Sequence, residues 1–298
     1  MSAIFLVLIS NLCFSFGSQF FAHYAKRFSS LWMNTLKATI ACLCFAFYLI
    51  IIKDFAFIES KTFSVLFLSG FIGLGIGDIF LLEAFSRLGP SRTLMLFSFN
   101  PLIVGILSFF LFGQIIPLYK LYAIFFFIIC LFLFSLEGKK KQGSWEVKGL
   151  LFALLGISLD ALGIILTKQA FEWEPSIHSI KANFLRCIGA LIAYFLIRFY
   201  TPINLLSKLK KLDFKALFWI ILACFLGTFL SLSLYLYAIQ QTNTLASITA
   251  LSITGVLFSS SFEYIWKKEL PSKYFWLSLV SFTIGMFFVL DLFRFFKF

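Results

Sequence analysis

The chain has 298 residues, of which 61% are hydrophobic and 13% charged, and its formal net charge is +12. Soluble globular domains are usually about 45–50% apolar, so this composition excludes that class and indicates an integral membrane protein. The basic charge does not indicate nucleic-acid binding, because most cations fall in short connections between apolar runs, where they set membrane orientation.

Ten apolar runs follow one another along the chain, each close to the roughly 20 residues that a membrane-spanning helix needs. In chain order they are residues 3–24, 31–52, 63–85, 91–112, 118–136, 149–170, 178–198, 215–239, 244–265 and 274–293. No basic segment precedes the first run, so we expect a retained helix rather than a signal peptide. The predicted fold class is all-α integral membrane, with ten transmembrane helices.

Residues 70–117 form the third and fourth predicted spans, joined by a tight turn at residues 87–92. The third span is rich in glycine, which lets another backbone approach closely, and it carries the carboxylate Asp78 within an apolar run. The fourth span contains Asn100-Pro101, a break in the helical hydrogen-bond ladder that membrane helices tolerate beside a neighbour or a cavity. Such a helix pair is typical of half of a transport path.

An internal repeat divides the chain into residues 1–138, a basic linker at 139–148, and residues 149–298. Adding 149 to the residue number, which we call the first offset, makes rare polar positions coincide: Asn11 with Asp160, Gln19 with Lys168, Asn34 with Asn183, and Lys37 with Arg186. Later in each half the number to add becomes 154, the second offset, which pairs Gly73 with Gly227 and Ala84 with Ala238. Five spans per half is an odd number, so the second half enters the membrane in the opposite orientation. The sequence therefore predicts two inverted five-helix repeats with a binding site at the midplane.

The distribution of Lys and Arg predicts which side of the membrane the termini face. The connections after the odd-numbered spans hold sixteen cations, whereas the other side, with both termini, holds seven. The positive-inside rule then places both termini outside the cytoplasm, in what we expect to be a bacterial inner membrane.

The segment AFSRLGPSRT at residues 84–93, followed by Asn100-Pro101 and Gly113-Gln114, completes a pattern with the two inverted halves. This pattern resembles the EamA-type branch of the drug/metabolite transporter superfamily, whose third helix commonly ends in an Ala-rich segment and a small-residue turn before a fourth helix with a central proline. In the second half Ala238 matches, and Gly255 stands in place of the proline. The family often has Gly-Glu where this chain has Gly113-Gln114, and many members are drawn with cytosolic termini.

Two cations, Lys37 and Arg186, occupy equivalent places in the second helix of each half, where the resemblance also implies a cation. An unpaired charge in the membrane interior costs roughly 2.5–3.5 kcal/mol, so each must pair or face a wet cavity. A substrate carboxylate or phosphate bound by Arg186 or Lys37 is one interpretation. A structural salt bridge, or snorkelling of the side chain to the helix end, is the other.

Asp160 could bind a substrate amine or carry a proton, and a structural bridge to Arg186 is the alternative. The same two interpretations, a functional group or a structural bridge, apply to Asp78. A polar stripe along the first helix recurs every fourth residue, and it either lines the path or bonds to a neighbouring helix. The stripe is made of Asn11, Ser15, Gln19 and His23. Asn34, Asn183 and Tyr235 complete the set of expected substrate-binding candidates, whereas Glu83 with Arg87 is expected to be a structural i,i+4 pair.

No cofactor, metal or catalytic residue is expected. The six cysteines form no CxxC or Cys/His cluster, and neither HExxH nor Gly-x-Ser-x-Gly occurs. We therefore expect a secondary transporter, not an enzyme, that moves a small zwitterionic or anionic metabolite resembling an amino acid or a nucleoside. A proton or counter-substrate could be coupled to transport, and the protein would be a monomer or a homodimer. The alternatives are an exporter of drugs or lipophilic cations, a channel, a scaffold or a membrane-embedded enzyme.

Overall fold

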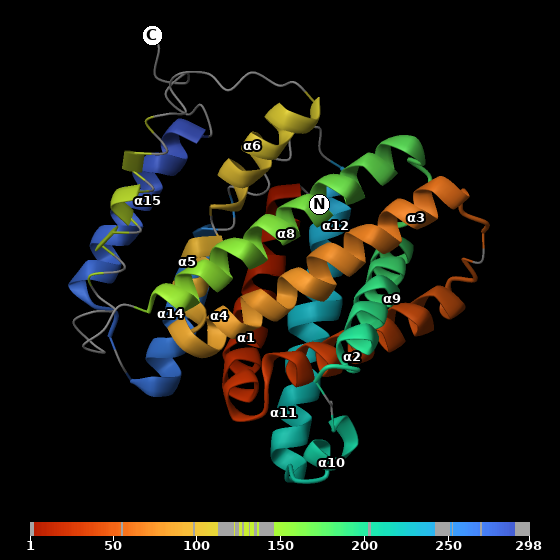
Figure 1. The fold of residues 1–298 in the computed structure, drawn as a ribbon, viewed down its shortest axis with the longest axis horizontal. Helices are drawn as coiled ribbons and strands as arrows, with labels where there is room; N and C mark the ends of the chain where they lie inside the picture. The colour runs from red at the N-terminus through yellow and green to blue at the C-terminus, as the bar shows by residue number, and fades with distance from the viewer. Residues whose placement is uncertain are drawn as a thin grey trace.

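The computed structural model is helical in the part of the chain that it describes, with no strand there (Figure 1). The described residues are 3–54, 56–97, 99–112, 122, 125–126, 128–130, 132–133, 136, 146–201, 204–241, 251, 253–268 and 270–289. Most of the fifth predicted span, 118–136, and most of the predicted linker, 139–148, lie outside them. Helices are described within the other nine predicted ranges.

The elements of the two halves follow the predicted spans closely. The first half contains α1 (Ala3–Arg27), α2 (Ser30–Ile51), α3 (Ser60–Ser69), η1 (Gly70–Gly77), α4 (Asp78–Leu88), α5 (Pro90–Phe97) and α6 (Asn100–Phe112). The second half contains α8 (Val147–Trp173), α9 (Ser179–Ile197), α10 (Leu205–Leu209), α11 (Phe214–Cys224), η2 (Phe225–Leu230), α12 (Ser231–Gln240), α14 (Ile253–Lys267) and α15 (Lys273–Val289).

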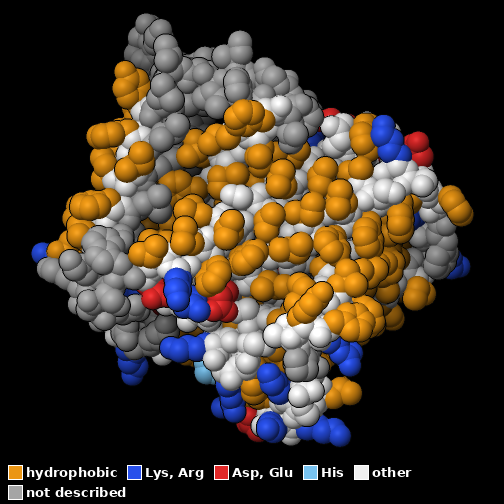
Figure 2. Space-filling model, in the orientation of Figure 1, with side chains coloured by type: hydrophobic (Ala, Val, Ile, Leu, Met, Phe, Trp, Pro, Cys, Tyr) orange, Lys and Arg blue, Asp and Glu red, His pale blue; other side chains and the backbone are white. Residues whose placement is uncertain are grey.

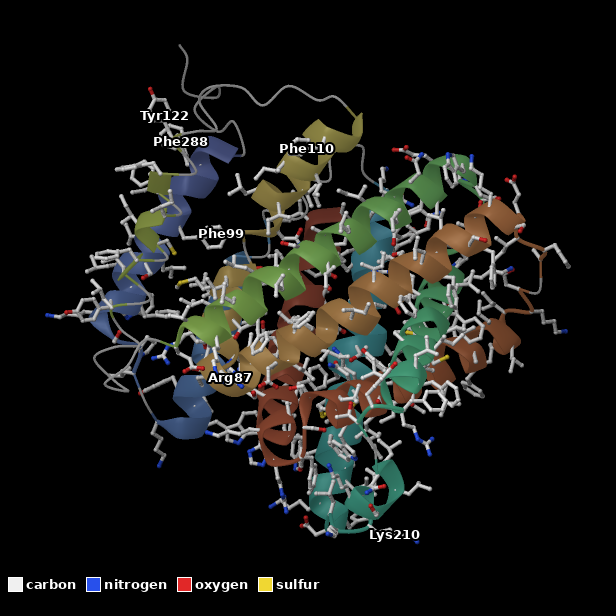
Figure 3. The ribbon with its side chains drawn as sticks, viewed as in Figure 1. Arg87, Phe99, Phe110, Tyr122, Lys210 and Phe288 are labelled. Atoms are coloured by element: carbon white, nitrogen blue, oxygen red, sulfur yellow. The ribbon has the colours of Figure 1, made fainter. Side chains whose placement is uncertain are left out.

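Six helical stretches in the described residues are long and apolar enough to cross a membrane. They are Ala3–Arg27, Ser30–Ile51, Ser60–Leu88, Val147–Trp173, Ser179–Ile197 and Phe214–Gln240. Hydrophobic side chains cover most of the face shown in Figure 2, whereas Lys and Arg gather toward its lower end. Figure 3 places Arg87 and Lys210 toward that end of the molecule. An apolar surface bounded by charge is the surface that a bilayer requires.

Local sequence explains where several helices begin and end. The Ser29 side chain accepts a hydrogen bond from the Trp32 backbone N–H at 3.1 Å and so caps the first turn of α2. Helix α4 ends at Gly89, whose φ of 88° is strained for any residue with a side chain. Pro90 then opens α5, where its missing N–H removes no intrahelical bond. The expected break between the two helices is therefore confirmed, but it is confined to Gly89, because residues 87–88 and 90–92 of the predicted turn are helical.

The third and eighth predicted spans each contain a π-helical segment near the middle. Segment η1 is Gly70–Gly77, and segment η2 is Phe225–Leu230. The second offset, which aligns the later part of each half, carries η1 onto positions 224–231, and these enclose η2. Inserted π-turns are rare and widen the helix locally, and they are frequent at functional sites.

Each of these two long helices packs mainly on the first two helices of the other half. Segment η1 lies against α8 and α9, and η2 lies against α1 and α2. The contacts are close because glycine permits them: a Cβ added at Gly70 would collide with the backbone oxygen of Arg186, and one at Gly227 would lie 2.8 Å from the Cα of Gly17. The centre of the molecule is therefore built from both halves, crossing each other.

Candidate functional site

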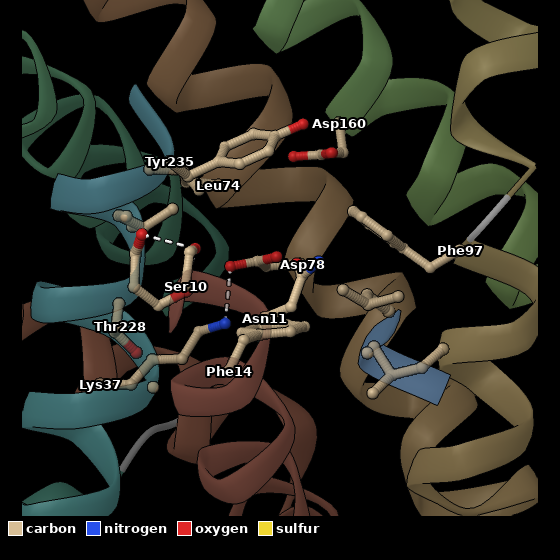
Figure 4. A pocket seen from close by; sticks show the side chains of 16 residues that line it. Ser10, Asn11, Phe14, Lys37, Leu74, Asp78, Phe97, Asp160, Thr228 and Tyr235 are labelled. Carbon is tan, nitrogen blue, oxygen red and sulfur yellow. Dashed lines mark hydrogen bonds and ion pairs between the residues drawn. The ribbon is translucent and has the colours of Figure 1, made fainter. Parts of the chain in front are cut away.

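A cavity of about 90 Å³ lies where the crossing helices meet (Figure 4). Its lining comes from α1, α2, η1, α4 and α5 of the first half, and from α8, η2, α12 and α14 of the second. The polar residues that line it are Lys37, Asp78, Asp160, Asn11, Ser10, Thr228, Ser231 and Tyr235. Aromatic and aliphatic walls complete it, Phe14, Leu81, Leu94 and Phe97 among them. A polar cavity between apolar helices is a candidate solute site.

Lys37 forms an ion pair with Asp78 across the space between α2 and α4. The Lys37 Nζ lies 2.6 Å from the Asp78 Oδ2, and the two side chains are 4% and 12% exposed. The ammonium also lies 5.5 Å from the centroid of the Phe21 ring. Lys37 therefore pairs in the interior of the protein rather than snorkelling to a helix end, and both partners still line the cavity.

Asp160 reaches the cavity from α8, and it is bound differently from Asp78. Its Oδ2 accepts a hydrogen bond from the Asn100 side-chain amide at 3.1 Å. Among the described residues it forms no ion pair, so the expected alternative of a bridge to Arg186 is absent there. In Figure 4 the Asp160 carboxylate and the Tyr235 hydroxyl lie near one another, with Phe97 across the cavity. The Asp160 carboxylate thus faces the cavity, with one of its two oxygens bonded to Asn100.

Arg186 lies in α9 and is 1% exposed, outside the cavity lining. Its Nε donates a hydrogen bond to the Ser69 hydroxyl at 3.1 Å, and that hydroxyl in turn lies 2.7 Å from the Thr167 Oγ1. No ion pair of Arg186 occurs among the described residues. Its positive charge nevertheless acts on Asp160, Asp78 and Tyr235, all of which line the cavity.

The polar stripe of α1 bonds mainly to the segment that includes α14. Asn11 donates to the Leu251 carbonyl and to the Thr254 hydroxyl, both at 2.9 Å. Further along α1, Ser15 donates to the Gly255 carbonyl, and Gln19 donates to Ser259. Of the candidates in this stripe only Asn11 also lines the cavity, whereas His23 is exposed.

Asn34 and Asn183 make equivalent hydrogen bonds in the two halves. The Asn34 amide donates to the Asp78 backbone carbonyl at 2.8 Å, and the Asn183 amide donates to the Leu232 carbonyl at 2.9 Å. The first offset relates the two asparagines, and the second offset relates Asp78 to Leu232. Neither asparagine lines the cavity, and within the described residues each side-chain oxygen is buried without a hydrogen-bond partner.

Two further pairs of contacts obey the same offsets. Asn11 with Thr254 corresponds to Asp160 with Asn100, although the donor and acceptor roles are exchanged. At the ends of the molecule, the Trp32 indole donates to the Leu205 carbonyl at 3.4 Å, and Lys181 donates to the Ala56 carbonyl at 2.7 Å. The first offset relates Trp32 to Lys181, and it also relates Ala56 to Leu205. We call the last two contacts the end contacts, and each joins one half to the other.

A family model matches the chain twice, over residues 1–136 and again over residues 147–291, and it describes an EamA-like transporter family. The chain belongs to the EamA-like transporter family. It is accordingly an integral membrane protein and a membrane transporter of the drug/metabolite transporter superfamily. A solved structure described only as "Crystal structure of protein" is similar in fold, with a TM-score of 0.68 and 12% sequence identity over 99% of each chain. A search of curated proteins finds no match.

Several lining residues of this EamA-like chain were not among the expected candidates. Thr228 is the clearest case, because its Oγ1 is buried with no hydrogen-bond partner in the described part of the chain and the residue lines the cavity. The spacing of Thr228, Ser231 and Tyr235 places all three on one helical face, a signal that the sequence already contained. The apolar walls Phe14 and Phe97 carry no such signal, because 44 phenylalanines occur in the chain.

The structure offers no evident metal centre, since no group of three or more His, Cys, Asp or Glu side chains comes together in the described residues. The expected Glu83–Arg87 pair is confirmed at 2.8 Å, and Arg87 also reaches Glu146 at 3.4 Å, so this cluster joins α4 to the residue that precedes α8. The Glu83 and Arg87 side chains are 32% and 36% exposed. This cluster lies outside the cavity lining and is a structural contact between the halves.

Proposed function

We propose that this chain is a secondary active transporter that moves a small zwitterionic or anionic metabolite by alternating access through the cavity of Figure 4. The observation that carries the proposal is the cavity itself, because both halves contribute charged and polar side chains to its lining inside an apolar protein. Charged groups at that depth are expensive and mark solute or ion pathways. The role is transport and not catalysis.

The proposed mechanism requires two halves that are inverted copies of one another. Three pairs of hydrogen bonds that agree with the first and second offsets support such a repeat, as does the double match to one family model. In transporters of this type the solute site lies at the interface of the repeats, and one half rocks against the other.

The end contacts support alternating access because each can close one end of the path. The Trp32–Leu205 contact lies on the cation-rich side, which we propose is cytoplasmic. On the opposite side Lys181 pairs with Asp54 at 2.8 Å in addition to its bond with Ala56. Of the two end contacts, the one that includes the Lys181–Asp54 ion pair is the stronger. Both chain termini would lie on that extracytoplasmic side, in a bacterial inner membrane.

The charged lining of the cavity supports a zwitterionic or anionic metabolite over the alternative of lipophilic drugs. Export of lipophilic cations remains the second candidate function, favoured by the aromatic walls Phe14 and Phe97 beside the acid Asp160.

Counterflow in proteoliposomes tests the proposal. Vesicles that contain the purified chain are loaded with one solute class at a time, from amino acids, nucleosides, sugar phosphates and lipophilic cations, and uptake of a labelled trace is followed. We expect saturable exchange of an amino acid or a nucleoside. Asp160→Asn, a change in the cavity lining, should weaken it by about tenfold or more while leaving the folded yield nearly unchanged, with Asp213→Asn as an exposed control outside the cavity. Conductance without saturation would indicate a channel and would refute the proposal.

A further inference from the structure

Two basic and two acidic side chains lie in or beside the cavity. Lys37 and Asp78 line it as a pair, Asp160 lines it without an ion-pair partner in the described residues, and Arg186 lies behind the wall as the fourth charge. A ligand with a net charge would disturb this balance in an environment of low dielectric constant, where an uncompensated charge is costly. The arrangement favours a ligand that has no net charge yet carries charged groups.

One part of the cavity accepts hydrogen bonds. The Asp160 carboxylate uses one oxygen for Asn100, and its other oxygen has no hydrogen-bond partner among the described residues. The Tyr235 hydroxyl lies beside it in Figure 4. Both groups line the cavity, and a carboxylate binds an ammonium by a short, charge-assisted hydrogen bond.

Another part of the cavity donates hydrogen bonds. The Lys37 ammonium has three N–H donors, of which one serves Asp78. The Thr228 hydroxyl lies on the same side of the cavity in Figure 4, and it is buried with no hydrogen-bond partner among the described residues. Thr228 belongs to the π-helical segment η2. A ligand carboxylate could accept from both groups while Asp78 keeps its own contact with Lys37.

Building on the proposed transport function, we propose that the solute is a zwitterion of the α-amino-acid class with an apolar side chain, bound in one orientation. Its ammonium binds Asp160 and Tyr235, and its carboxylate binds Lys37 and Thr228. The apolar side chain contacts the walls that include Phe14 and Phe97. A nucleoside carries neither an ammonium nor a carboxylate, and a simple anion would supply no cation to pair with Asp160.

Binding of three related probes to the purified full-length chain tests both ends of the site. L-leucine carries both charged groups, 3-methylbutylamine lacks the carboxylate, and 4-methylpentanoate lacks the ammonium. Each charged contact that is lost should weaken binding by about tenfold or more. L-leucine should therefore bind more tightly than either of the other two.

Two variants test which charged group of the ligand binds at which end of the cavity. Asp160→Asn can keep its bond to Asn100, and it should weaken L-leucine and 3-methylbutylamine by about tenfold or more but should not weaken 4-methylpentanoate, from which it removes a like charge. Thr228→Val should weaken L-leucine and 4-methylpentanoate but not the amine. Tyr235→Phe gives a second test at the Asp160 end if Asp160→Asn fails to fold, and Asp213→Asn should change nothing.

The possible failures can be told apart. Equal weakening of all three probes by Asp160→Asn, or an unchanged affinity for L-leucine, would overturn the proposed orientation. Counterflow of a nucleoside or an anion by a protein that does not bind L-leucine would overturn the zwitterion class while leaving the transport function intact. A folded protein that exchanges no solute class would overturn the transport function, and this inference with it.

Discussion

The Lys37–Asp78 ion pair allows a double-mutant test, because the second half of the chain has an apolar residue at the position equivalent to Asp78. The position equivalent to Asp78 is Leu232, whose backbone carbonyl accepts the matching asparagine bond. The variant Lys37→Met alone leaves a buried carboxylate without its cation, and Asp78→Leu alone leaves a buried ammonium. Breaking a buried pair in this way costs about 3–5 kcal/mol, because the remaining charge is desolvated and uncompensated.

The double variant Lys37→Met/Asp78→Leu removes both charges and should be close to wild type in stability, since apolar replacement of a buried pair is often neutral. At roughly 2–4 °C per kcal/mol, each single variant should lower the unfolding temperature by about 6–20 °C, measured by thermal unfolding in detergent. The double variant should nonetheless lose transport, because the Lys37 end of the proposed site is gone.

The exposed Glu83–Arg87 pair supplies the matched control. Its side chains are about one-third exposed, so Arg87→Met should cost no more than about 1 kcal/mol. The reasoning would be refuted if Lys37→Met were no more destabilising than Arg87→Met. It would also be refuted if the double variant lost the sum of the two single effects, because the two charges would then act independently.

Three further variants probe the packing between the halves. Gly70→Ala places a Cβ against the backbone of Arg186, so it should cost about 1–3 kcal/mol or more and lower the unfolding temperature and folded yield. Tyr194→Phe removes the hydroxyl that donates to the Leu74 carbonyl within η1, and the buried acceptor left behind should cost about 1–3 kcal/mol, seen as faster hydrogen exchange in η1. Lys181→Gln breaks the ion pair at one end contact, and mass spectrometry should show faster hydrogen exchange in the connection between α2 and α3 but not at the opposite end.

The sequence predicted the helices that the structure describes, because their apolar runs are long enough to span a membrane. It also singled out the residues that need a partner, because a charge in an apolar run is costly unless it is paired or hydrated. It could not predict which neighbour would satisfy each charge. The sequence leaves Arg186 as a candidate partner of Asp160, whereas in the structure Asn100 donates to Asp160 instead. Periodicity assigns a residue to a helix face, but the partner depends on how helices cross, and a single sequence does not contain that information.

The π-helical segments show a second limit of the sequence. Four glycines in the third span correctly indicated close backbone approach, yet a widened turn has no compositional signature of its own. Segment η2 contains one glycine, Gly227, and is widened as well. The common cause is therefore the tertiary packing, since each π-segment lies where its helix meets two helices of the other half.

The two halves make equivalent backbone contacts but differ in charge, and the difference falls at the cavity. Lys37 has Asp78 as a partner, whereas its counterpart Arg186 has Leu232 at the equivalent place and bonds to Ser69 instead. Asp160 in turn stands where the first half has the neutral Asn11. Two identical halves would bind a symmetric ligand with equal ends. In the proposed site, Asp78 of the first half is already paired with Lys37, and Asp160 of the second half is the acid without an ion-pair partner among the described residues. This arrangement favours a solute with opposite charges at its two ends, with its ammonium toward the second half and its carboxylate toward the first.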